Sequence, residues 1–479
     1  MKAVFLLADT FRRDHLGAYG NKWIHTPNLD RLAAMSNVFD SHYIGSFPTL
    51  PNRRDTHLGL GDKGLPLNRW RPIDEDEITL AERLTDAGIP SMMVNDVANS
   101  CLQTRRVSNN KITQMNHNKG FGFFLGNRGQ EGDNCFSDDT VPLEFPVDPN
   151  LIRYPASGWH KILMNRAHRR VEDDWFAPGT YKLGCEWLER NWRRDQFFLW
   201  IETFDPHEPW DPPQWHIDRY DPGYKGRVFD APVYGRFKEF GITDREMKQI
   251  RARYAGECAM VDTAVGRLLA TLDKLNLLHE VAIIFTTDHG AYFGYPGDND
   301  LLGKPHSVGA DGKVMGGGPV DPPQPPLRHF AQFTGVCRTP LLVHLPGQTK
   351  MARFRQITQP WDLTPTVLEL FGLKAPAEFL GQSLIPLIQG KQKATRRAAI
   401  MGAAAHHIQA MNRDWIYTVW HTQVGQGPSL IDLKNDKSQT RNVAGKNRGV
   451  CKQLLKEIER FVRRQKSVPD TFMDTLATD

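Results

Sequence analysis

The chain has 479 residues, which is long enough for one large α/β domain and a smaller second unit. Hydrophobic residues make up 40% and charged residues 24%, as in a soluble globular enzyme. The formal net charge is only +5, with Lys and Arg spread along the chain, which argues against a nucleic-acid partner. No apolar stretch reaches membrane-spanning length, so we expect no membrane partner either.

The N-terminal apolar run and the cysteines bear on the compartment. Residues 3–8 form a run too short for a secretory signal, and it already ends at Asp9, so it predicts a strand. The cysteines lack a CxxC pair and fit reduced thiols better than a disulfide framework. They are Cys101, Cys135, Cys185, Cys258, Cys337 and Cys451. The sequence therefore predicts a cytoplasmic protein, and it does not indicate an oligomeric state.

Apolar runs rich in β-branched residues alternate with helical patterns along most of the chain. This alternation predicts an α/β fold with a large mixed, mostly parallel sheet sandwiched by helices. The predicted strands lie near residues 2–8, 89–95, 196–204, 281–287 and 340–345.

Helix boundaries are also visible in the sequence. Thr26 before Pro27 predicts a capping hydroxyl at a helix start. Thr79 with Glu82 predicts a capping box, and Gly88 ends that helix. Apolar residues recur at helical spacing over residues 243–277, which predicts one long helix or two.

Two stretches resist assignment, and the C-terminal part differs in pattern. Residues 205–235 and 294–328 are rich in Pro, Gly or Asp, and we expect loops that shape a substrate pocket. After about residue 390, short apolar runs and a closing helix near 450–464 predict a small C-terminal α+β subdomain. We therefore predict a catalytic domain over residues 1–390 and a subdomain over residues 391–479.

Polar residues follow two of the predicted strands and form a candidate site. Asp9 ends the first apolar run, and Asp288 with His289 follows the run 281–287. Ligands of open α/β sheets bind outside the carboxyl ends of the strands, and two carboxylates brought together there favour a cation between them. A strand-end Asp can also simply cap the next helix. Thr49, followed by Arg53, offers a nucleophilic hydroxyl and a guanidinium for an anionic substrate.

Several motifs in order resemble the sulfatase branch of the alkaline phosphatase superfamily. They are Asp9-Thr-Phe-Arg-Arg-Asp-His-Leu-Gly-Ala-Tyr-Gly20, Thr26-Pro-Asn-Leu-Asp-Arg-Leu-Ala33, Asp288-His-Gly290 and Gly303-Lys304. The resemblance extends from the first strand to at least residue 390. It implies an alkaline phosphatase/sulfatase-like fold and an ester hydrolase that acts on a small-molecule anionic ester.

The resemblance implies that Asp9, Asp288 and His289 hold one divalent cation, with Thr49 as a further ligand. Many sulfatases carry a second Asp directly after the first, where this chain has Thr10. Fewer hard anionic ligands beside an imidazole favour Mn or Zn, with Ca or Mg as alternatives.

Thr49 departs from the family pattern. The family motif has Cys or Ser, any residue, Pro, usually Ser, then Arg, whereas this chain has Thr49-Leu-Pro-Asn-Arg53. Conversion to formylglycine requires an unbranched CH2–X carbon, and the methyl group on the Cβ of Thr prevents it. A direct threonine alkoxide on the metal remains, which favours phosphate or phosphonate esters over sulfate esters. The alternative is that Thr49 is an ordinary turn residue in an inactive site.

The resemblance also implies roles for three other residues. Arg53 would steady the nucleophile segment and the leaving anion, His207 would contact the oxyanion or protonate the leaving oxygen, and Lys304 would bind the anionic group. A further Lys/His pair of the family is absent after the strand near residue 95, where Asn99 could still donate a hydrogen bond to the substrate.

The leading hypothesis is a metal-dependent hydrolase of sulfate, phosphate or phosphonate esters with Thr49 as direct nucleophile. The alternatives are a transferase that passes the threonyl-bound group to an acceptor alcohol, and an inactive sulfatase-like binding protein. Retention of Asp9, Asp288, His289, Arg53 and Lys304 weighs against the inactive form, because a fold needs none of them for its core.

Overall fold

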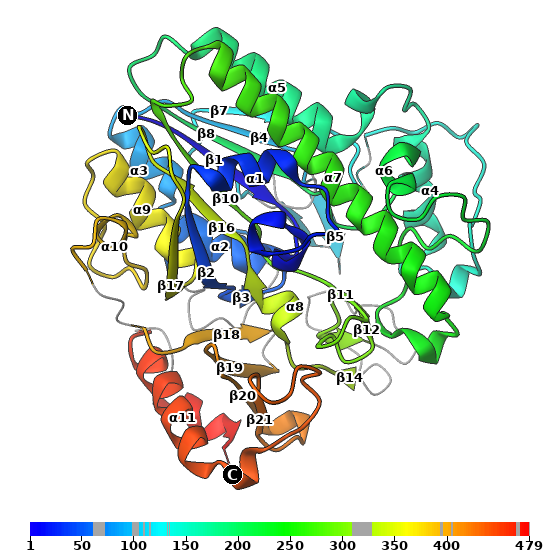
Figure 1. Cartoon of the computed structure of the whole chain (residues 1–479), viewed down its shortest axis with the longest axis vertical. Coiled ribbons are helices and arrows are strands. Elements are labelled where there is room, and N and C mark those ends of the chain that lie inside the picture. Colours follow the sequence, from blue (N-terminus) through cyan, green and yellow to red (C-terminus); the bar gives the residue numbers. More distant parts are fainter. Residues whose placement is uncertain are drawn as a thin grey trace.

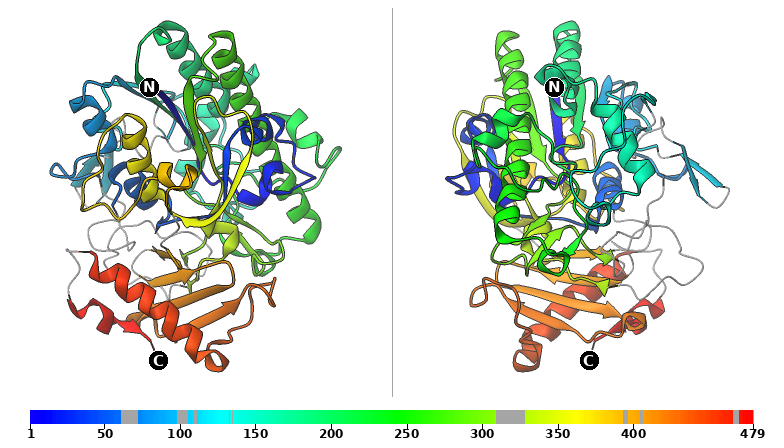
Figure 2. Two further views of the ribbon diagram at one scale, coloured as in Figure 1. Left: turned by 60° about the vertical axis from the view of Figure 1, so that its left-hand side comes forward. Right: turned by 90° about the vertical axis from the view of Figure 1, so that its right-hand side faces the viewer.

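The chain folds around two β-sheets (Figure 1). The computed structural model describes residues 1–60, 72–97, 105–108, 111–114, 116–131, 133, 135–308, 328–392, 396–403, 406–465 and 470–478. Both views of Figure 2 place the smaller sheet and its helix beneath the larger sheet, at the end that carries the C-terminus. No helix within these described ranges is long and apolar enough to cross a bilayer.

The larger sheet has nine strands in the order β15-β2-β16-β10-β1-β8-β4-β7, with β17 paired to β2. Strands β7, β4, β8, β1 and β10 run parallel, whereas β16 is antiparallel to both β10 and β2. This arrangement confirms the predicted mixed, mostly parallel sheet. The strands are β1 (Lys2–Ala8), β2 (Asn37–Tyr43), β4 (Ser91–Asn95), β7 (Phe123–Gly126), β8 (Phe197–Thr203), β10 (Val281–Thr286), β15 (Arg338–Thr339), β16 (Leu341–His344) and β17 (Ala352–Thr358).

Helices cover both faces of the larger sheet, which explains why its central strands are apolar without alternation. Val4 and Leu6 of β1 pack with α1, α5 and α7, and Phe5 and Leu7 pack with α3 and α9 on the other face. Figure 1 shows α5 and α7 crossing the sheet. The helices are α1 (Pro27–Ala34), α2 (Thr49–Leu58), α3 (Leu80–Asp86), α4 (Ala156–Arg166), α5 (Phe176–Asn191), α6 (Gln214–Asp218), α7 (Asp244–Lys274), α8 (Thr334–Cys337), α9 (Leu363–Leu370), α10 (Ile385–Ile388) and α11 (Arg448–Arg463).

The predicted helix starts have different outcomes. The capping box of Thr79 and Glu82 is confirmed, and residues 244–274 form one helix rather than two. The capping role of Thr26 is wrong, because its hydroxyl accepts a hydrogen bond from the N–H of Gly17 at 3.0 Å. The carboxylate of Asp262 on α7 instead accepts the N–H groups of the first turn of α1, at 3.2 and 2.7 Å.

The smaller sheet has six strands in the order β21-β20-β19-β18-β3, with β22 paired to β20. Its first strand in sequence, β3, comes from the N-terminal part of the chain and lies parallel to β18. Leu454, Ile458 and Val462 of α11 are buried against the sheet. The strands are β3 (Ser46–Phe47), β18 (Ala399–Ala403), β19 (His407–Met411), β20 (Trp415–His421), β21 (Ser429–Asp432) and β22 (Leu476–Ala477). The predicted boundary near residue 390 stays a prediction.

The two unassigned stretches contain little regular structure. Within residues 205–235 the structure has only α6 and part of β9, and residues 309–327 lie outside the described residues. Among the described residues, short strands form three small sheets. β12 (Leu301–Gly303) pairs with β11 (Tyr292–Phe293) and with β9 (Gly235–Arg236), and β13 (Ser307–Val308) pairs with β14 (Arg328–His329). β5 (Arg105–Ser108) pairs with β6 (Lys111–Gln114).

Candidate active site

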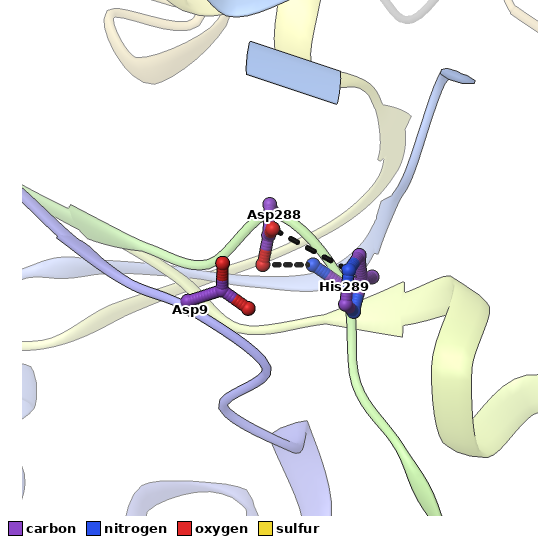
Figure 3. A group of neighbouring side chains, drawn as sticks. All are labelled: Asp9, Asp288 and His289. Atoms are coloured by element: carbon purple, nitrogen blue, oxygen red, sulfur yellow. Dashed lines mark hydrogen bonds and ion pairs between the residues drawn. The ribbon is translucent and has the colours of Figure 1, made fainter. Parts of the chain in front are cut away.

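The ends of β1 and β10 bring the predicted metal ligands together. These strands are parallel neighbours, with Leu7 opposite Thr286, so the residues that follow them share one sheet edge. Asp9, Asp288 and His289 are each fully buried, and one ligand atom from each lies within 4.8 Å of the others (Figure 3). The predicted convergence of the three residues is therefore present.

The orientation of His289 fits a cation at this point. Its Nδ1 lies 2.9 Å from the carbonyl oxygen of Gly290, which can only accept, so Nδ1 carries the proton. The lone pair of Nε2 then faces Oδ2 of Asp288 at 3.4 Å. Burial lowers the pKa of His289, which keeps the ring neutral. A lone pair opposed to a carboxylate, with the other nitrogen fixed by a backbone carbonyl, is typical of a metal-binding histidine.

Asp288 is held in its ionised form. Burial alone would raise its pKa, but the charges of Arg53 and Lys304 and the N–H of Thr10 hold the pKa of Asp288 below its ordinary value. Its Oδ1 also accepts the N–H groups of Thr10 at 3.0 Å and of His289 at 2.8 Å. The carboxylate is therefore a charged ligand across the physiological pH range.

Thr10 connects the two carboxylates instead of supplying a third. Its hydroxyl donates to Oδ1 of Asp9 at 2.5 Å, while its N–H donates to Asp288. The residue has a φ of 64°, an unusual conformation for a β-branched side chain that the two hydrogen bonds and the surrounding core maintain. The lost acidic ligand is thus replaced by a positioning group.

The guanidinium of Arg53 binds three carboxylates at once. Nη1 lies 2.7 Å from Oδ2 of Asp288 and Nη2 lies 3.0 Å from Oδ2 of Asp9, while Nε donates to Glu202. Burial would lower the pKa of Arg53, but Glu202, Asp288 and Asp9 raise it above its ordinary value. Because these acids engage three of its nitrogens, Arg53 orients the carboxylates of the candidate metal site.

Sequence reasoning missed Glu202, which lies at the end of β8 and is fully buried. Its Oε2 accepts a hydrogen bond from the indole nitrogen of Trp200 at 2.9 Å, and burial raises the pKa of Glu202. A glutamate directly after the apolar run of residues 197–201 was the available signal, because a buried acid needs a partner, although the run does not show which partner.

Thr49 is the first residue of α2, so its segment begins a helix and is not a tight turn. Pro51 is compatible with this, because a proline in the first turn removes no helical hydrogen bond. The Thr49 hydroxyl lies 3.2 Å from Nε2 of His289 and is nearly inaccessible to solvent. The N-terminus of a helix is electropositive, which favours negative charge on a group placed there.

Lys304 and His207 lie next to this group. Nζ of Lys304 is 3.2 Å from the hydroxyl of Thr10 and 3.9 Å from Oδ1 of Asp9. The His207 ring stacks on Phe204 at 3.8 Å, and its Nδ1 donates to the carbonyl oxygen of Glu208 at 2.6 Å. Burial and then Lys304 lower the pKa of His207 well below its ordinary value. The ring is therefore neutral, with its lone pair on Nε2. Asn99 lies outside the described residues.

Comparisons with known proteins identify the family of the chain. The sulfatase family profile matches residues 2–373, and a profile of the C-terminal region of N-sulphoglucosamine sulphohydrolase matches residues 331–465. An arylsulfatase of Clostridium perfringens is 23% identical over 480 residues, which cover 92% of this chain and 89% of that protein.

Two solved structures show the shared fold. The phosphonate monoester hydrolase of Agrobacterium radiobacter superposes with a TM-score of 0.69 at 18% identity, covering 96% of both chains. A structure in complex with its substrate D-glucosamine-2-N,6-O-disulfate superposes with a TM-score of 0.65 at 16% identity, covering 97% of this chain and 98% of that one. Because the sulfatase profile spans most of the chain, the protein belongs to the sulfatase family and is an ester hydrolase of the alkaline phosphatase superfamily.

Proposed function

We propose that this protein is a metal-dependent hydrolase of phosphate, phosphonate or sulfate esters that uses the Thr49 hydroxyl as its nucleophile. The observation that carries the proposal is the 3.2 Å approach of that hydroxyl to Nε2 of His289, inside a buried group of acidic residues. The substrate would be a small anionic ester.

Asp9, Asp288 and His289 would hold one divalent cation. Arg53 and Lys304 carry two positive charges against the three carboxylates of Asp9, Glu202 and Asp288, so the ionised group still requires positive charge. When bound, the cation would neutralise an anionic oxygen of the substrate and lower the pKa of a nearby hydroxyl. The imidazole ligand and the absence of a second Asp favour Mn or Zn, with Ca or Mg as alternatives.

Thr49 would attack the central phosphorus or sulfur atom of the ester. The bond from that atom to the alcohol oxygen breaks, the alcohol leaves, and water then opens the threonyl ester to restore the hydroxyl. The electropositive first turn of α2 favours the developing charge on Thr49.

The surrounding residues would divide the remaining tasks. Lys304, 3.9 Å from Asp9, is placed to bind an anionic oxygen of the substrate. The ring of His207 is neutral without substrate, and an anionic substrate beside it would raise its pKa, which would let Nε2 take up a proton and return it to a leaving oxygen. Arg53 fixes the metal-binding carboxylates.

The Thr49 side chain favours phosphate and phosphonate esters. Its Cβ methyl prevents formylglycine formation, so the sulfate-releasing collapse of an aldehyde hydrate is not available, and phosphorus tolerates hydrolysis of a threonyl intermediate more readily than sulfur does. The relatives include both a phosphonate monoester hydrolase and an arylsulfatase, so both chemistries fit the fold.

Metal analysis followed by a substrate panel tests the proposal. The purified protein is loaded in turn with Mn, Zn, Ca and Mg and assayed with aryl sulfate, phosphate monoester, phosphodiester and phosphonate ester substrates. We expect one bound metal and the highest kcat/KM with a phosphorus ester. A dominant aryl sulfatase activity would contradict the phosphorus preference, transfer to an added alcohol in place of hydrolysis would favour the transferase, and metal binding without turnover would favour the inactive protein.

A further inference from the structure

A cavity outside the candidate metal-binding group lies between the loop that follows β1 and the N-terminal half of α7. Its volume is about 520 Å³, within the range of small-molecule sites. Its walls include the aromatic rings of Trp23, Tyr220 and Tyr295 and the imidazole of His15. None of the residues that line it belongs to the group proposed for ester cleavage.

Trp23 is exposed yet held in place. Its side chain is 47% exposed, which is unusual for so large an apolar group. Oδ1 of Asn21 accepts the N–H groups of Trp23 at 2.8 Å and of Ile24 at 3.0 Å, and Nδ2 of Asn21 donates to the carbonyl of Asp14 at 2.6 Å. The loop that presents the indole is therefore fixed by its own hydrogen bonds, which reduces the entropy lost when a ligand binds.

The other rings are fixed as well. The Tyr220 ring centroid lies 4.8 Å from that of Trp23 at an interplanar angle of 55°, and the Tyr220 hydroxyl accepts the N–H of His25 at 3.1 Å. The Tyr295 hydroxyl lies 3.3 Å from Nε2 of His15. Arg251 stacks over Tyr295 at 4.4 Å and donates to the carbonyls of Phe293 and Gly294, each at 2.8 Å. The aromatic walls are thus preorganised.

The charges around the cavity limit the kind of ligand. A Trp and two Tyr rings could form a cage for an alkylammonium group, but Lys248 and Arg251 line the same cavity and repel a cation. At the rim, the carboxylate of Asp14 is 56% exposed and binds Arg12 at 2.6 Å, so an anion placed there would compete with it for that guanidinium. A neutral ligand with both an apolar face and polar edges fits this combination.

We propose that this cavity binds a neutral pyranose ring of a saccharide. The axial C–H groups of a pyranose form an apolar face that packs on an indole or phenol ring, and its hydroxyls form a polar edge. The exposed Asp14 carboxylate can accept from these hydroxyls. Lys248, 62% exposed with one contact to Asp221 at 3.2 Å, has donors left to give.

The cavity is mechanically joined to the catalytic edge of the sheet. The His15 ring packs on Tyr254 at 5.0 Å, and the Tyr254 hydroxyl accepts the N–H of Arg12 at 2.8 Å and donates to the carbonyl of Thr10 at 2.7 Å. Thr10 in turn binds Asp9. A saccharide bound here would therefore rest on the same loop that positions the metal-binding carboxylates.

Calorimetric titration with neutral oligosaccharides tests the proposal on the full chain. The probes are hexasaccharides of glucose, mannose, galactose and xylose, which carry no anionic group for the ester-cleaving site. We expect at least one to bind the wild type, and Trp23→Ala to weaken that binding roughly tenfold or more. Lys248→Ala should weaken it several-fold. Trp215→Ala is the matched control, because Trp215 is 54% exposed but does not line the cavity.

Three outcomes would overturn the saccharide site. The first is that none of the four hexasaccharides binds. The second is that Trp23→Ala and Trp215→Ala weaken binding equally, and the third is that choline binds in a manner that depends on Trp23. The titration needs neither metal nor turnover, so a failure of the proposed ester cleavage would leave its result unaffected.

Discussion

Nη1 of Arg53 lies 2.7 Å from Oδ2 of Asp288, and neither side chain is exposed to solvent. The same guanidinium binds Asp9 and Glu202, so residues of three different strand ends are fixed by one side chain of α2. A buried charge without a partner is strongly destabilising, so loss of the guanidinium would leave all three carboxylates uncompensated. The site is therefore also a structural element of the sheet edge.

Replacement of Arg53 by Ala should reduce the free energy of unfolding by about 3–5 kcal/mol, because it leaves three buried carboxylates without their common partner. Urea denaturation measures the loss. Arg31→Ala is the control, since Arg31 is 48% exposed and lies 3.7 Å from an exposed Asp273. The control should change stability by less than about 0.5 kcal/mol. An Arg53→Ala variant as stable as the control would show that the carboxylates do not depend on the guanidinium.

Replacement of Asp288 by Asn should abolish metal binding and turnover while the protein stays folded. The amide removes the charge that a divalent cation requires, and it keeps the shape of the side chain. Elemental analysis of the purified variant measures the bound metal. Asp96→Asn is the matched control, because Asp96 also follows a strand of the same sheet and is buried, but lies outside the metal-binding group. Wild-type metal content in Asp288→Asn would contradict the proposed ligand set.

The pH dependence of stability should report on Asp96. Burial and the neighbouring Asp205 raise the pKa of Asp96 to about 8. The folded protein therefore keeps a proton that the unfolded chain releases above roughly pH 4. The contribution of Asp96 to the free energy of unfolding is complete below that pH. As the pH rises further, this contribution falls by up to about 1.4 kcal/mol per pH unit until the pKa of the folded state is passed.

Asp96→Asn removes this dependence, because an amide does not titrate in this range. The amide can still donate to the hydroxyls of Thr180 and Thr203, which lie 2.7 and 3.0 Å from Oδ2 in the wild type. Between pH 5 and pH 8 the variant should gain stability relative to the wild type, as measured by urea denaturation at each pH. The exposed Asp86→Asn should show no such trend. A constant difference between wild type and Asp96→Asn over this range would mean that Asp96 is ionised in the folded protein.

The fold was largely predictable because its central strands are continuous apolar runs. The run 2–8 coincides with β1, the run 196–204 extends beyond β8 by one residue at each end, and the run 281–287 extends beyond β10 by one residue. Strands β2, β7 and β17 of the larger sheet, and β3 and β19 of the smaller sheet, were not predicted. β3 has two residues and depends on pairing with β18, which is far away in the sequence, and β19 follows an alanine-rich stretch without a clear period. Such pairing is a property of the tertiary structure.

Part of the candidate site could likewise be predicted from the sequence, and part could not. Asp9, Asp288 and His289 could be named because they lie within three residues of a strand end, and the topology brings neighbouring strand ends together. Glu202 could not, because its role depends on Arg53, which is 149 residues away in the sequence. The cap on α1 failed for a related reason, since Asp262 of α7 supplies the acceptor that Thr26 was expected to provide.

Thr49 decides the chemistry, so its substitution is the most informative. Thr49→Ala should lower kcat by about a thousandfold or more, because the nucleophile is gone, while Asp9, Asp288 and His289 still bind the metal. Thr49→Ser should keep part of the activity, since the hydroxyl survives. Thr56→Ala is the matched control, because Thr56 is also a buried threonine of α2 but donates only to the carbonyl of Asn52, at 3.1 Å.

Mass spectrometry adds a test that does not depend on rates. The wild-type peptide should contain an unmodified threonine, and rapid quenching with a slow phosphoester should add the mass of the transferred group to that peptide. A small residual rate in Thr49→Ala is expected from the remaining charged groups. If Thr49→Ala instead retained the wild-type kcat/KM, the hydroxyl would not be the nucleophile, and a water molecule held at the same carboxylates would have to attack the ester.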